Sequence, residues 1–316
     1  MEAVDQTFMS KILLFGEYSL IHDSMALSIP FDGFKGDLTF EPKILLGEKA
    51  KESNKHLAEY AEFLRSKIES GEFPFEFNIE LFEEDIKNGI VFDSNIPQGF
   101  GVGSSGALIA VLYANYAKDP ISNEKDNTEK EMATLKSQFA YMESYFHGVS
   151  SGMDPLICYL NKPVLLEGKQ NLNSVGLPEF KENSKRAIFL IDTGKPGKTQ
   201  PLVSLFLEKC KEEGYIKSIK EELIPFNNSC IKSFLKGEAK EMFASLKELS
   251  HYLLANLNPM IPEQFHAIWE KGIQTGAYYL KLCGSGGGGF ILGFTEDIEK
   301  AKNELKDYSL KVVHQF

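Results

Sequence analysis

A glycine-rich stretch of this chain reads Ile96-Pro97-Gln98-Gly99-Phe100-Gly101-Val102-Gly103-Ser104-Ser105-Gly106-Ala107. Its alternating glycines let the backbone adopt positive φ values and approach a ligand closely. The apolar run Ala107–Ala114 follows directly and predicts a buried helix that starts near Ser104. The start of such a helix presents unpaired N–H groups and the positive end of the helix dipole to an anion. The stretch therefore predicts a phosphate-binding loop, with contacts from Pro97, Gly99, Gly101, Gly103, Ser104 and Ser105. A tight turn with a serine N-cap is the plainer alternative.

Two well-known phosphate-binding patterns do not account for this loop. Gly101-x-Gly103-x-x-Gly106 matches the dinucleotide fingerprint, but that fingerprint directly follows a strand and has an acidic residue about 20 positions later. Here Pro97 interrupts the approach, and the region around residue 125 reads as a polar loop. Gly197-Lys198-Thr199 resembles the end of a P-loop, but Asp192 stands where the first glycine is required. These departures indicate a different nucleotide fold.

The composition excludes several classes of function. A length of 316 residues suggests about two domains. The net charge of −11 argues against broad binding to nucleic acids or anionic membranes. No apolar stretch approaches the roughly 20 residues of a membrane span, and Met1–Ser10 lacks the pattern of a signal peptide, so we expect a cytoplasmic protein. The cysteines are scattered and are expected to be reduced thiols: Cys158, Cys210, Cys230 and Cys283.

The remaining pattern predicts an α+β protein of two domains. Ile12–Phe15 and Tyr18–Ile21 are expected to form an opening hairpin or bent strand, and Phe75–Leu81 alternates like a half-buried strand. Helical spacing marks Lys55–Ser70. A shift to polar residues between positions 169 and 185 predicts the domain boundary. We therefore expect domains of residues 1–178 and 179–316.

A second motif, Glu143–Pro155, pairs two carboxylates across a short loop. Mg²⁺ favours one or two carboxylates together with phosphate oxygens and water, so Glu143 beside Ser105 is a candidate magnesium ligand. Asp154 is a candidate general base. Because Pro155 follows it, Asp154 could instead be an N-cap with proline at the first helical position.

A third motif, Lys281–Phe290, has five glycines in the six positions 284–289. So many glycines sacrifice stability for close approach of the backbone, which an ordinary hairpin does not require. This favours a loop that faces a ligand, and a flexible turn between strands is the alternative. Lys11, just before the first expected strand, would be an ordinary exposed lysine without these motifs.

Together, in this order and spacing, the motifs resemble those of the GHMP kinases, which include galactokinase, homoserine kinase, mevalonate kinase and phosphomevalonate kinase. The resemblance spans nearly the whole chain. Three features are most similar to the mevalonate kinases within this superfamily. Lys11–Tyr18 is similar to their K-x-x-L-x-G-E-H, Glu143–Asp154 to their E-x-x-x-H-G-x-x-S-G-x-D, and Asp192–Thr199 to their N-T-x-x-x-x-x-T.

The resemblance implies an N-terminal domain like the second domain of ribosomal protein S5 and a ferredoxin-like C-terminal domain. Asp154 would be the catalytic base, and Lys11 would stabilise the alkoxide or polarise the attacking hydroxyl. Ser105 and Glu143 would hold Mg²⁺. The other implied contacts are Thr199, Gly286 and Gly287 with ATP, in addition to the loop, and Glu17, Tyr18, His147 and Gly148 with the substrate.

The implied activity is ATP-dependent phosphorylation of a small-molecule alcohol, with mevalonate giving 5-phosphomevalonate in isoprenoid precursor synthesis. Another substrate of the superfamily, such as phosphomevalonate, is the alternative. A non-catalytic nucleotide-binding regulator would lack Asp154 or Lys11, and both are present. Nucleic-acid and membrane partners are not expected, and the protein would be a monomer or homodimer. Tyr18 replaces the histidine usual in mevalonate kinases, and this departure bears on the substrate contact.

Overall fold

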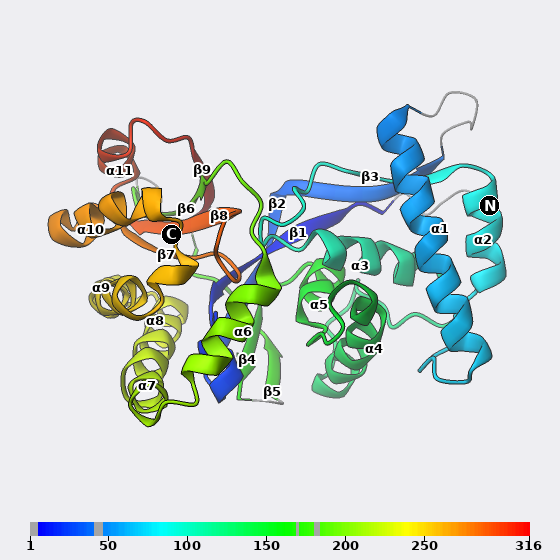
Figure 1. Cartoon of the computed structure of the whole chain (residues 1–316), viewed down its shortest axis with the longest axis horizontal. Helices are drawn as coiled ribbons and strands as arrows, with labels where there is room; N and C mark the ends of the chain where they lie inside the picture. The colour runs from blue at the N-terminus through cyan, green and yellow to red at the C-terminus, as the bar shows by residue number, and fades with distance from the viewer. Residues whose placement is uncertain (1–5, 41–46, 169–170, 180–183) are drawn as a thin grey trace. The chain divides into compact units, whose positions relative to one another are not determined.

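The chain forms two compact units that are interleaved in sequence. A computed structural model describes residues 6–40, 47–168, 171–179 and 184–316 (Figure 1). Unit 1 contains the chain up to Lys11, Pro30–Ile96 and Gly103–Lys162, and unit 2 contains Ile12–Ile29, Pro97–Val102 and Pro163–Phe316. Helices and antiparallel strands occur in both units, which confirms the expected α+β class.

The first sheet consists of β1 (Phe8–Phe15), β2 (Ala26–Phe40), β3 (Ile90–Ser94), β4 (Val164–Glu167) and β5 (Asn171–Ser174). Its strand order is β1-β2-β4-β5, and β3 pairs with the far part of β2. The pairs β2–β3, β2–β4 and β4–β5 are antiparallel. Both β1 and β2 begin in one unit and continue into the other.

The helices in the described part of unit 1 are α1 (Glu48–Glu69), α2 (Ile79–Lys87), α3 (Ser104–Tyr116), α4 (Glu129–His147) and α5 (Met153–Leu160). Helix α3 starts at Ser104 and is apolar on all sides, as expected, because α4 and α5 both pack against it (Figure 1). Helix α4 begins with a capping box between Thr128 and Glu131 and ends at Gly148.

The expected strand at Tyr18–Ile21 is wrong. Residues Ser19–His22 form a 3₁₀ helix, η1. Tyr18 has a φ of 62° and a ψ of −43°, and the Ser19 N–H donates to the Glu17 carbonyl across it at 2.7 Å. This is a γ-turn with positive φ, which is rare for a non-glycine residue and turns the chain out of the strand.

The expected strand at Phe75–Leu81 is also wrong. Phe77 makes an isolated bridge, and α2 begins at Ile79. The side chain of Asn78 accepts a hydrogen bond from the Leu81 N–H at 3.3 Å and so caps the helix. Alternation of apolar residues does not reveal such a cap, and it is the cap that ends the extended segment.

The second sheet lies in unit 2 and consists of β6 (Ala187–Asp192), β7 (Tyr279–Leu282), β8 (Phe290–Thr295) and β9 (Leu310–Gln315). Its order is β7-β8-β6-β9, and its pairs are antiparallel. Helices separate β6 from β7 and β8 from β9, which gives the order of a β-α-β-β-α-β unit. This confirms the expected ferredoxin-like topology.

Most helical elements that follow β6 lie between β6 and β7 in the sequence, and α11 lies between β8 and β9. Helices α8 and α9 pack together, and α9 and α10 contact β7 (Figure 1). The elements are α6 (Thr199–Lys209), α7 (Glu213–Ser218), η3 (Ile219–Leu223), α8 (Ile224–Lys236), α9 (Ala239–Asn256), η4 (Asn258–Met260), η5 (Glu263–Phe265), α10 (His266–Thr275) and α11 (Ile298–Glu304).

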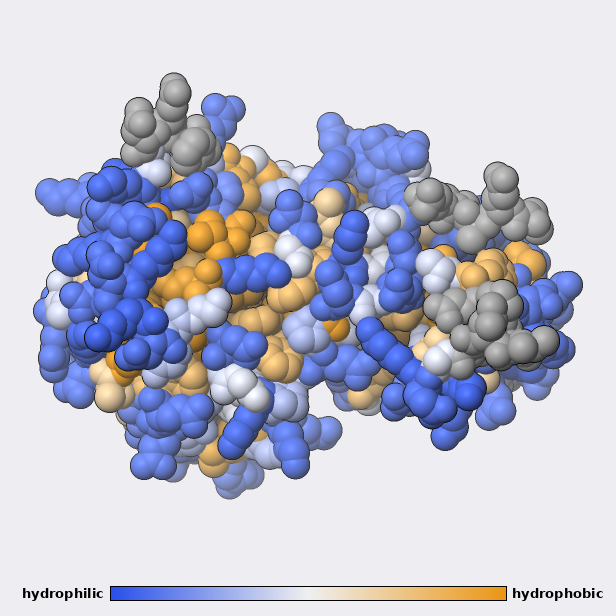
Figure 2. Space-filling view, turned by 90° about the horizontal axis from the view of Figure 1, so that it is seen from above, coloured by the Kyte–Doolittle hydropathy of each residue, from blue (hydrophilic) through white to orange (hydrophobic). Residues whose placement is uncertain are grey.

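Charged and polar residues dominate one face of the molecule. The face in Figure 2 is mostly hydrophilic, with smaller hydrophobic areas between the polar side chains. This agrees with a chain in which 25% of the residues are charged. None of the helices in the described ranges is long and apolar enough to cross a membrane.

A buried ion pair joins two distant parts of unit 2. The Nζ atom of Lys281, in β7, lies 2.6 Å from Oε1 of Glu17, and the two side chains are 2% and 5% exposed. The same Nζ donates to the Leu282 carbonyl at 2.7 Å. Desolvated charges of this kind are costly unless each is paired and hydrogen-bonded. The pair therefore ties the segment after β1 to the strand that leads into the third glycine motif.

We predict that Lys281→Met lowers the free energy of unfolding by about 3–5 kcal/mol, because it leaves the Glu17 carboxylate buried without its cation. The control is Lys302→Met, which removes an exposed i,i+3 pair with Glu299. Its effect should stay below about 1 kcal/mol. Urea denaturation of both variants measures the difference, and equal midpoints would show that the buried pair has no special weight.

Gly152 fixes the start of α5. It is the N-cap, has a φ of 70°, and a Cβ atom there would collide with the carbonyl oxygen of Lys136 in α4. Gly71 also has a positive φ of 73°, but a Cβ atom there would meet nothing within 4 Å. A substitution at Gly71 therefore introduces backbone strain alone, whereas one at Gly152 introduces backbone strain and a steric collision.

We predict that Gly71→Ala costs about 1–2 kcal/mol of stability, the usual penalty for a left-handed alanine. Gly152→Ala should cost about 1–3 kcal/mol more, because α4 and α5 must also move apart. Thermal and urea unfolding of both variants test this. A Gly152→Ala variant no less stable than Gly71→Ala would contradict the close approach of the two helices.

Candidate active site

Lys11 and Asp154 form an ion pair within unit 1. The Nζ atom of Lys11 lies 2.8 Å from Oδ1 of Asp154, and the side chains are 4% and 40% exposed. Lys11 lies inside β1 rather than before it, and it is buried. Asp154 lies in the first turn of α5, and Gly152 is the N-cap. The alternative in which Asp154 caps the helix is therefore wrong, and its carboxylate is held by Lys11 while remaining partly open to solvent.

Glu143, in the last turns of α4, is a buried carboxylate with two serine donors. The Ser105 hydroxyl donates to Oε1 at 3.1 Å, and the Ser150 hydroxyl donates to Oε2. Burial and, to a smaller extent, the charge of Asp154 raise the pKa of Glu143 to about 7, against the lowering effect of Ser150, Ser105 and Lys11. The site thus holds a carboxylate that a cation would stabilise in its charged form.

His147 and Gly148 end the same helix. The Nε2 atom of His147 lies 3.3 Å from the Ser105 hydroxyl, and the histidine side chain is exposed. His147 is one turn beyond Glu143 on α4, so both side chains reach the same serine. Gly148 follows with a φ of 72° and ends the helix. His147, which the sequence assigns to substrate, therefore contacts Ser105, one of the two candidate metal ligands.

The start of α3 lies close to both members of the ion pair. A Cβ atom at Gly103 would be 2.8 Å from Cγ of Lys11, and one at Gly106 would be 2.9 Å from the backbone of Asp154. Gly103 is the N-cap, so no side chain caps the helix, and the alternative of a serine N-cap is wrong. Ser104 and Ser105 are instead the first two helical residues. The first turn of α3 thus lies beside Lys11 and Asp154.

The other part of the glycine loop belongs to unit 2, where three backbone segments lock together. The Gly197 N–H donates to the Gly99 carbonyl at 2.8 Å, and Gly289 donates to the Lys195 carbonyl at 2.6 Å. A Cβ atom at Gly101 would lie 2.5 Å from the Cys283 carbonyl oxygen. The half-buried Pro97 opens this segment. Glycines in these loops are required by close contacts between backbones.

Gly286 and Gly287 are constrained by η4. The Gly287 N–H donates to the Met260 carbonyl at 2.6 Å, and a Cβ atom at Gly286 would collide with the same carbonyl. That amide is therefore already used within the protein. Thr199 is the first residue of α6, and its side chain lies outside the described part of the chain.

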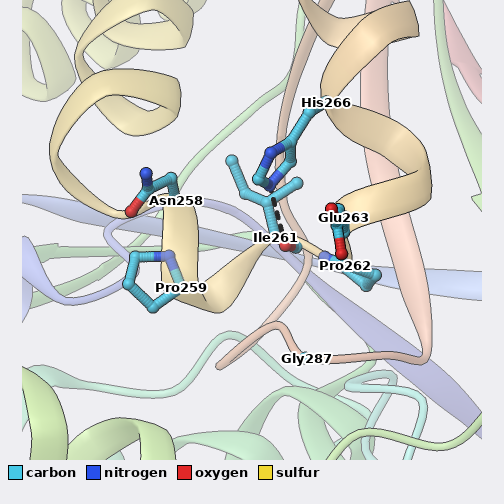
Figure 3. Close-up of a pocket in the computed structure, with 7 residues that line it drawn as sticks. All are labelled: Asn258, Pro259, Ile261, Pro262, Glu263, His266 and Gly287. Atoms are coloured by element: carbon cyan, nitrogen blue, oxygen red, sulfur yellow. Dashed lines mark hydrogen bonds between the residues drawn. The ribbon is translucent and has the colours of Figure 1, made fainter.

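Gly287 also borders an open depression of about 500 Å³ on unit 2. In Figure 3 the ring of His266 points to the Ile261 carbonyl, with 3.0 Å between Nε2 and that oxygen. The depression is lined by Asn258, Pro259, Ile261, Pro262, Glu263, His266 and Gly287. Gly287 is the only lining residue that the sequence assigns to a ligand.

Glu17 and Tyr18 are both anchored to the third motif. Glu17 pairs with Lys281, as described above. The Tyr18 hydroxyl donates to the Ser285 carbonyl at 2.7 Å, and its ring lies 4.7 Å from the ring of Phe206 in α6. Burial raises the pKa of Tyr18 well above its ordinary value, so the hydroxyl stays protonated. Both side chains are thus held by residues of the third motif, Glu17 by Lys281 and Tyr18 by Ser285.

Sequence reasoning gave no role to Ser150 or Lys281. A single serine in a turn carries no signal in one sequence, so the Ser150 contact with Glu143 could not be found. Lys281 offered a weak signal, because it is the one charged residue in the strand Tyr279–Leu282. A lone charge in a buried strand predicts a buried partner, but not which one.

The oxygen atoms of Glu143 and Ser105 are suitable ligands for Mg²⁺. This ion prefers oxygen ligands and often takes only one or two carboxylates, with phosphate oxygens and water completing its shell. Glu143 and Ser105 supply a carboxylate and a hydroxyl 3.1 Å apart. Across the ranges that the structure describes, no cluster of three or more His, Cys, Asp or Glu gathers into a metal site. The donor set therefore suits an ion that arrives with nucleotide phosphates.

Comparison with known proteins places these features in a family. The family model for the GHMP kinases N terminal domain matches residues 57–162, and the model for GHMP kinases C terminal matches residues 230–309. No curated protein matches the chain.

Solved structures share the fold at low sequence identity. The L. major mevalonate kinase in complex with R-mevalonate has a TM-score of 0.62 and 15% identity, covering 98% of this chain and 95% of that chain. The Methanococcus jannaschii mevalonate kinase has a TM-score of 0.60 and 21% identity, covering 98% of both chains. The Streptococcus pneumoniae phosphomevalonate kinase in complex with phosphomevalonate and AMPPNP has a TM-score of 0.62 and 12% identity, again covering 98% of both.

The two family models cover separate parts of one chain, and they include the start of α3, Glu143, Asp154 and the third glycine motif. With the ferredoxin-like sheet of unit 2, they account for both the sequence pattern and the fold. The chain belongs to the GHMP kinase family and is an ATP-dependent small-molecule kinase.

Proposed function

We propose that this kinase transfers the γ-phosphoryl group of ATP to the 5-hydroxyl of mevalonate, giving 5-phosphomevalonate for isoprenoid precursor synthesis. The observation that carries the chemistry is the Lys11–Asp154 ion pair, which lies beside the first turn of α3. The choice of alcohol rests on the motifs at Lys11–Tyr18 and Glu143–Asp154, and on the mevalonate kinases among the structures of similar fold.

Asp154 is the proposed base. As the substrate oxygen bonds to the γ-phosphorus, the bond from that phosphorus to the β,γ-bridging oxygen breaks, ADP leaves, and Asp154 accepts the hydroxyl proton. Lys11 holds the carboxylate in place and stabilises the negative charge that develops on the attacking oxygen. Because Lys11 is 4% exposed, water screens its charge poorly and its electrostatic effect is large.

The nucleotide is proposed to bind at the glycine loop and the start of α3. The first-turn N–H groups of α3 and its dipole favour the phosphates. Ser105 and Glu143 are the proposed Mg²⁺ ligands, and the bound ion would neutralise charge on the phosphate oxygens. The proposed substrate contacts are Glu17, Tyr18, His147 and Gly148.

We predict that ATP consumption by the purified protein is fastest with mevalonate in a panel that also contains phosphomevalonate, homoserine and galactose. The panel tests which alcohol is the substrate, and its result does not affect the assignment of the protein as a kinase. Faster turnover of phosphomevalonate would replace the proposed substrate with that of the related kinase, and mass spectrometry of the product would identify the phosphorylated oxygen.

We predict that Asp154→Asn lowers kcat by about 10²–10⁴-fold, the usual contribution of a general base, while ATP binding changes little. Asp119→Asn is the matched control, because Asp119 is also followed by a proline but is exposed. Steady-state kinetics and nucleotide titration of both variants provide the test. Normal turnover by Asp154→Asn would remove this residue from the mechanism.

A further inference from the structure

Ser150 lies between the two carboxylates of the second motif and contacts the elements that carry both. Its hydroxyl donates to Oε2 of Glu143 in α4. The Oγ atom of Ser150 in turn accepts a hydrogen bond from the Gly152 N–H at 3.0 Å. Gly152 is the N-cap of α5, and Asp154 follows in the first turn of that helix. One side chain thus connects the candidate metal ligand to the helix start that presents the candidate base.

The two oxygens of Glu143 have different donors. Oε1 accepts from Ser105, at the start of α3, and Oε2 accepts from Ser150. A carboxylate that is 4% exposed has little water to satisfy its lone pairs, so each protein donor restricts its rotation. With Oε2 held by Ser150, Oε1 keeps its direction towards Ser105. Ser150 therefore sets which oxygen the carboxylate offers to a cation shared with that hydroxyl.

We propose that Ser150 is a positioning residue for the magnesium–nucleotide complex, acting through the orientation of Glu143 and, through Gly152, on the start of α5. This inference rests on the proposed kinase function and on Glu143 as a metal ligand. Partners that orient a metal ligand without touching the metal commonly change metal affinity by about 10–100-fold when they are removed.

The experiment measures metal binding directly. Mn²⁺ is titrated into the full-length protein with a non-hydrolysable ATP analogue, and bound Mn²⁺ is followed by electron paramagnetic resonance. We expect Ser150→Ala to weaken Mn²⁺ binding about 10-fold or more. Affinity for the analogue without metal should change less than twofold. In activity assays, Ser150→Ala should need a higher metal concentration to reach half of its maximal rate. Its kcat at saturating metal should fall by a smaller factor than its metal affinity.

Ser144→Ala is the matched control. Ser144 is next to Glu143 on α4, but its hydroxyl donates to the Tyr141 carbonyl at 2.6 Å. Its loss removes a serine hydroxyl from the same helix turn, and metal affinity should stay within twofold of wild type. A Ser150→Ala variant that binds Mn²⁺ as tightly as Ser144→Ala overturns the inference.

Ser150→Thr and Ser150→Val separate the hydrogen bond from the shape of the turn. Their side chains are similar in size, but only threonine keeps a hydroxyl. The Ser150→Thr variant should bind Mn²⁺ within about threefold of wild type, and the Ser150→Val variant should bind it as weakly as the Ser150→Ala variant. Equal metal affinity of the two variants overturns the inference, even if Ser150→Ala is too unstable to measure.

The two proposals fail in distinguishable ways. If wild type phosphorylates mevalonate and Ser150→Ala binds Mn²⁺ normally, the positioning role is wrong and the proposed substrate stands. If wild type uses no alcohol in the panel but Ser150→Ala loses Mn²⁺ affinity, the positioning role stands and the proposed substrate is wrong.

Discussion

The burial of Lys11 inside β1 is the constraint on which the arrangement of unit 1 depends. A lysine cation that is 4% exposed loses most of its hydration, and this costs several kcal/mol unless a negative partner and hydrogen bonds replace the water. Asp154 supplies that partner, so the first turn of α5 must lie next to β1. The start of α3 then has to fit beside the same two residues, and only glycine leaves room there. Gly103 faces the Lys11 side chain and Gly106 faces the Asp154 backbone. The glycine spacing that dominates the sequence is therefore partly a consequence of one ion pair.

Unit 2 meets a different constraint, which is contact between backbone segments. Carbonyls and amides of the segments around Gly99, Gly197 and Gly289 satisfy one another. Side chains would separate these segments and leave buried polar groups without partners, which is costly. The buried ion pair between Glu17 and Lys281 stabilises the same region. An abundance of glycine here indicates an interlocked backbone as well as a loop that approaches a ligand.

Much of the fold and part of the candidate site could be predicted from the sequence. The buried helix after Gly103 followed from apolar patterning, and the resemblance to the family followed from motifs with fixed spacing. The ferredoxin-like order of β6 to β9 was an implication of that resemblance. The strands predicted at Tyr18–Ile21 and Phe75–Leu81 were wrong. A γ-turn in the first segment and an N-cap in the second prevailed over the local strand propensity. Ser150 could not be found, because its role depends on where α4 and α5 meet. The boundary between residues 178 and 179 and the roles of the site residues, Gly286 and Gly287 among them, stay predictions.

The interleaving of the two units has a consequence for synthesis on the ribosome. Unit 1 is complete in sequence at Lys162, so its strands and helices can fold while the rest of the chain is still being made. Unit 2 cannot, because Glu17 meets its cation 264 residues later. At the usual rate of translation the N-terminal part of unit 2 waits on the order of ten seconds after Lys162 emerges. During that interval Ile12–Ile29 and Pro97–Val102 are joined to a folded unit 1 but lack their partners in Pro163–Phe316. These two segments are therefore the first parts of unit 2 to be made, and they wait longest for their contacts.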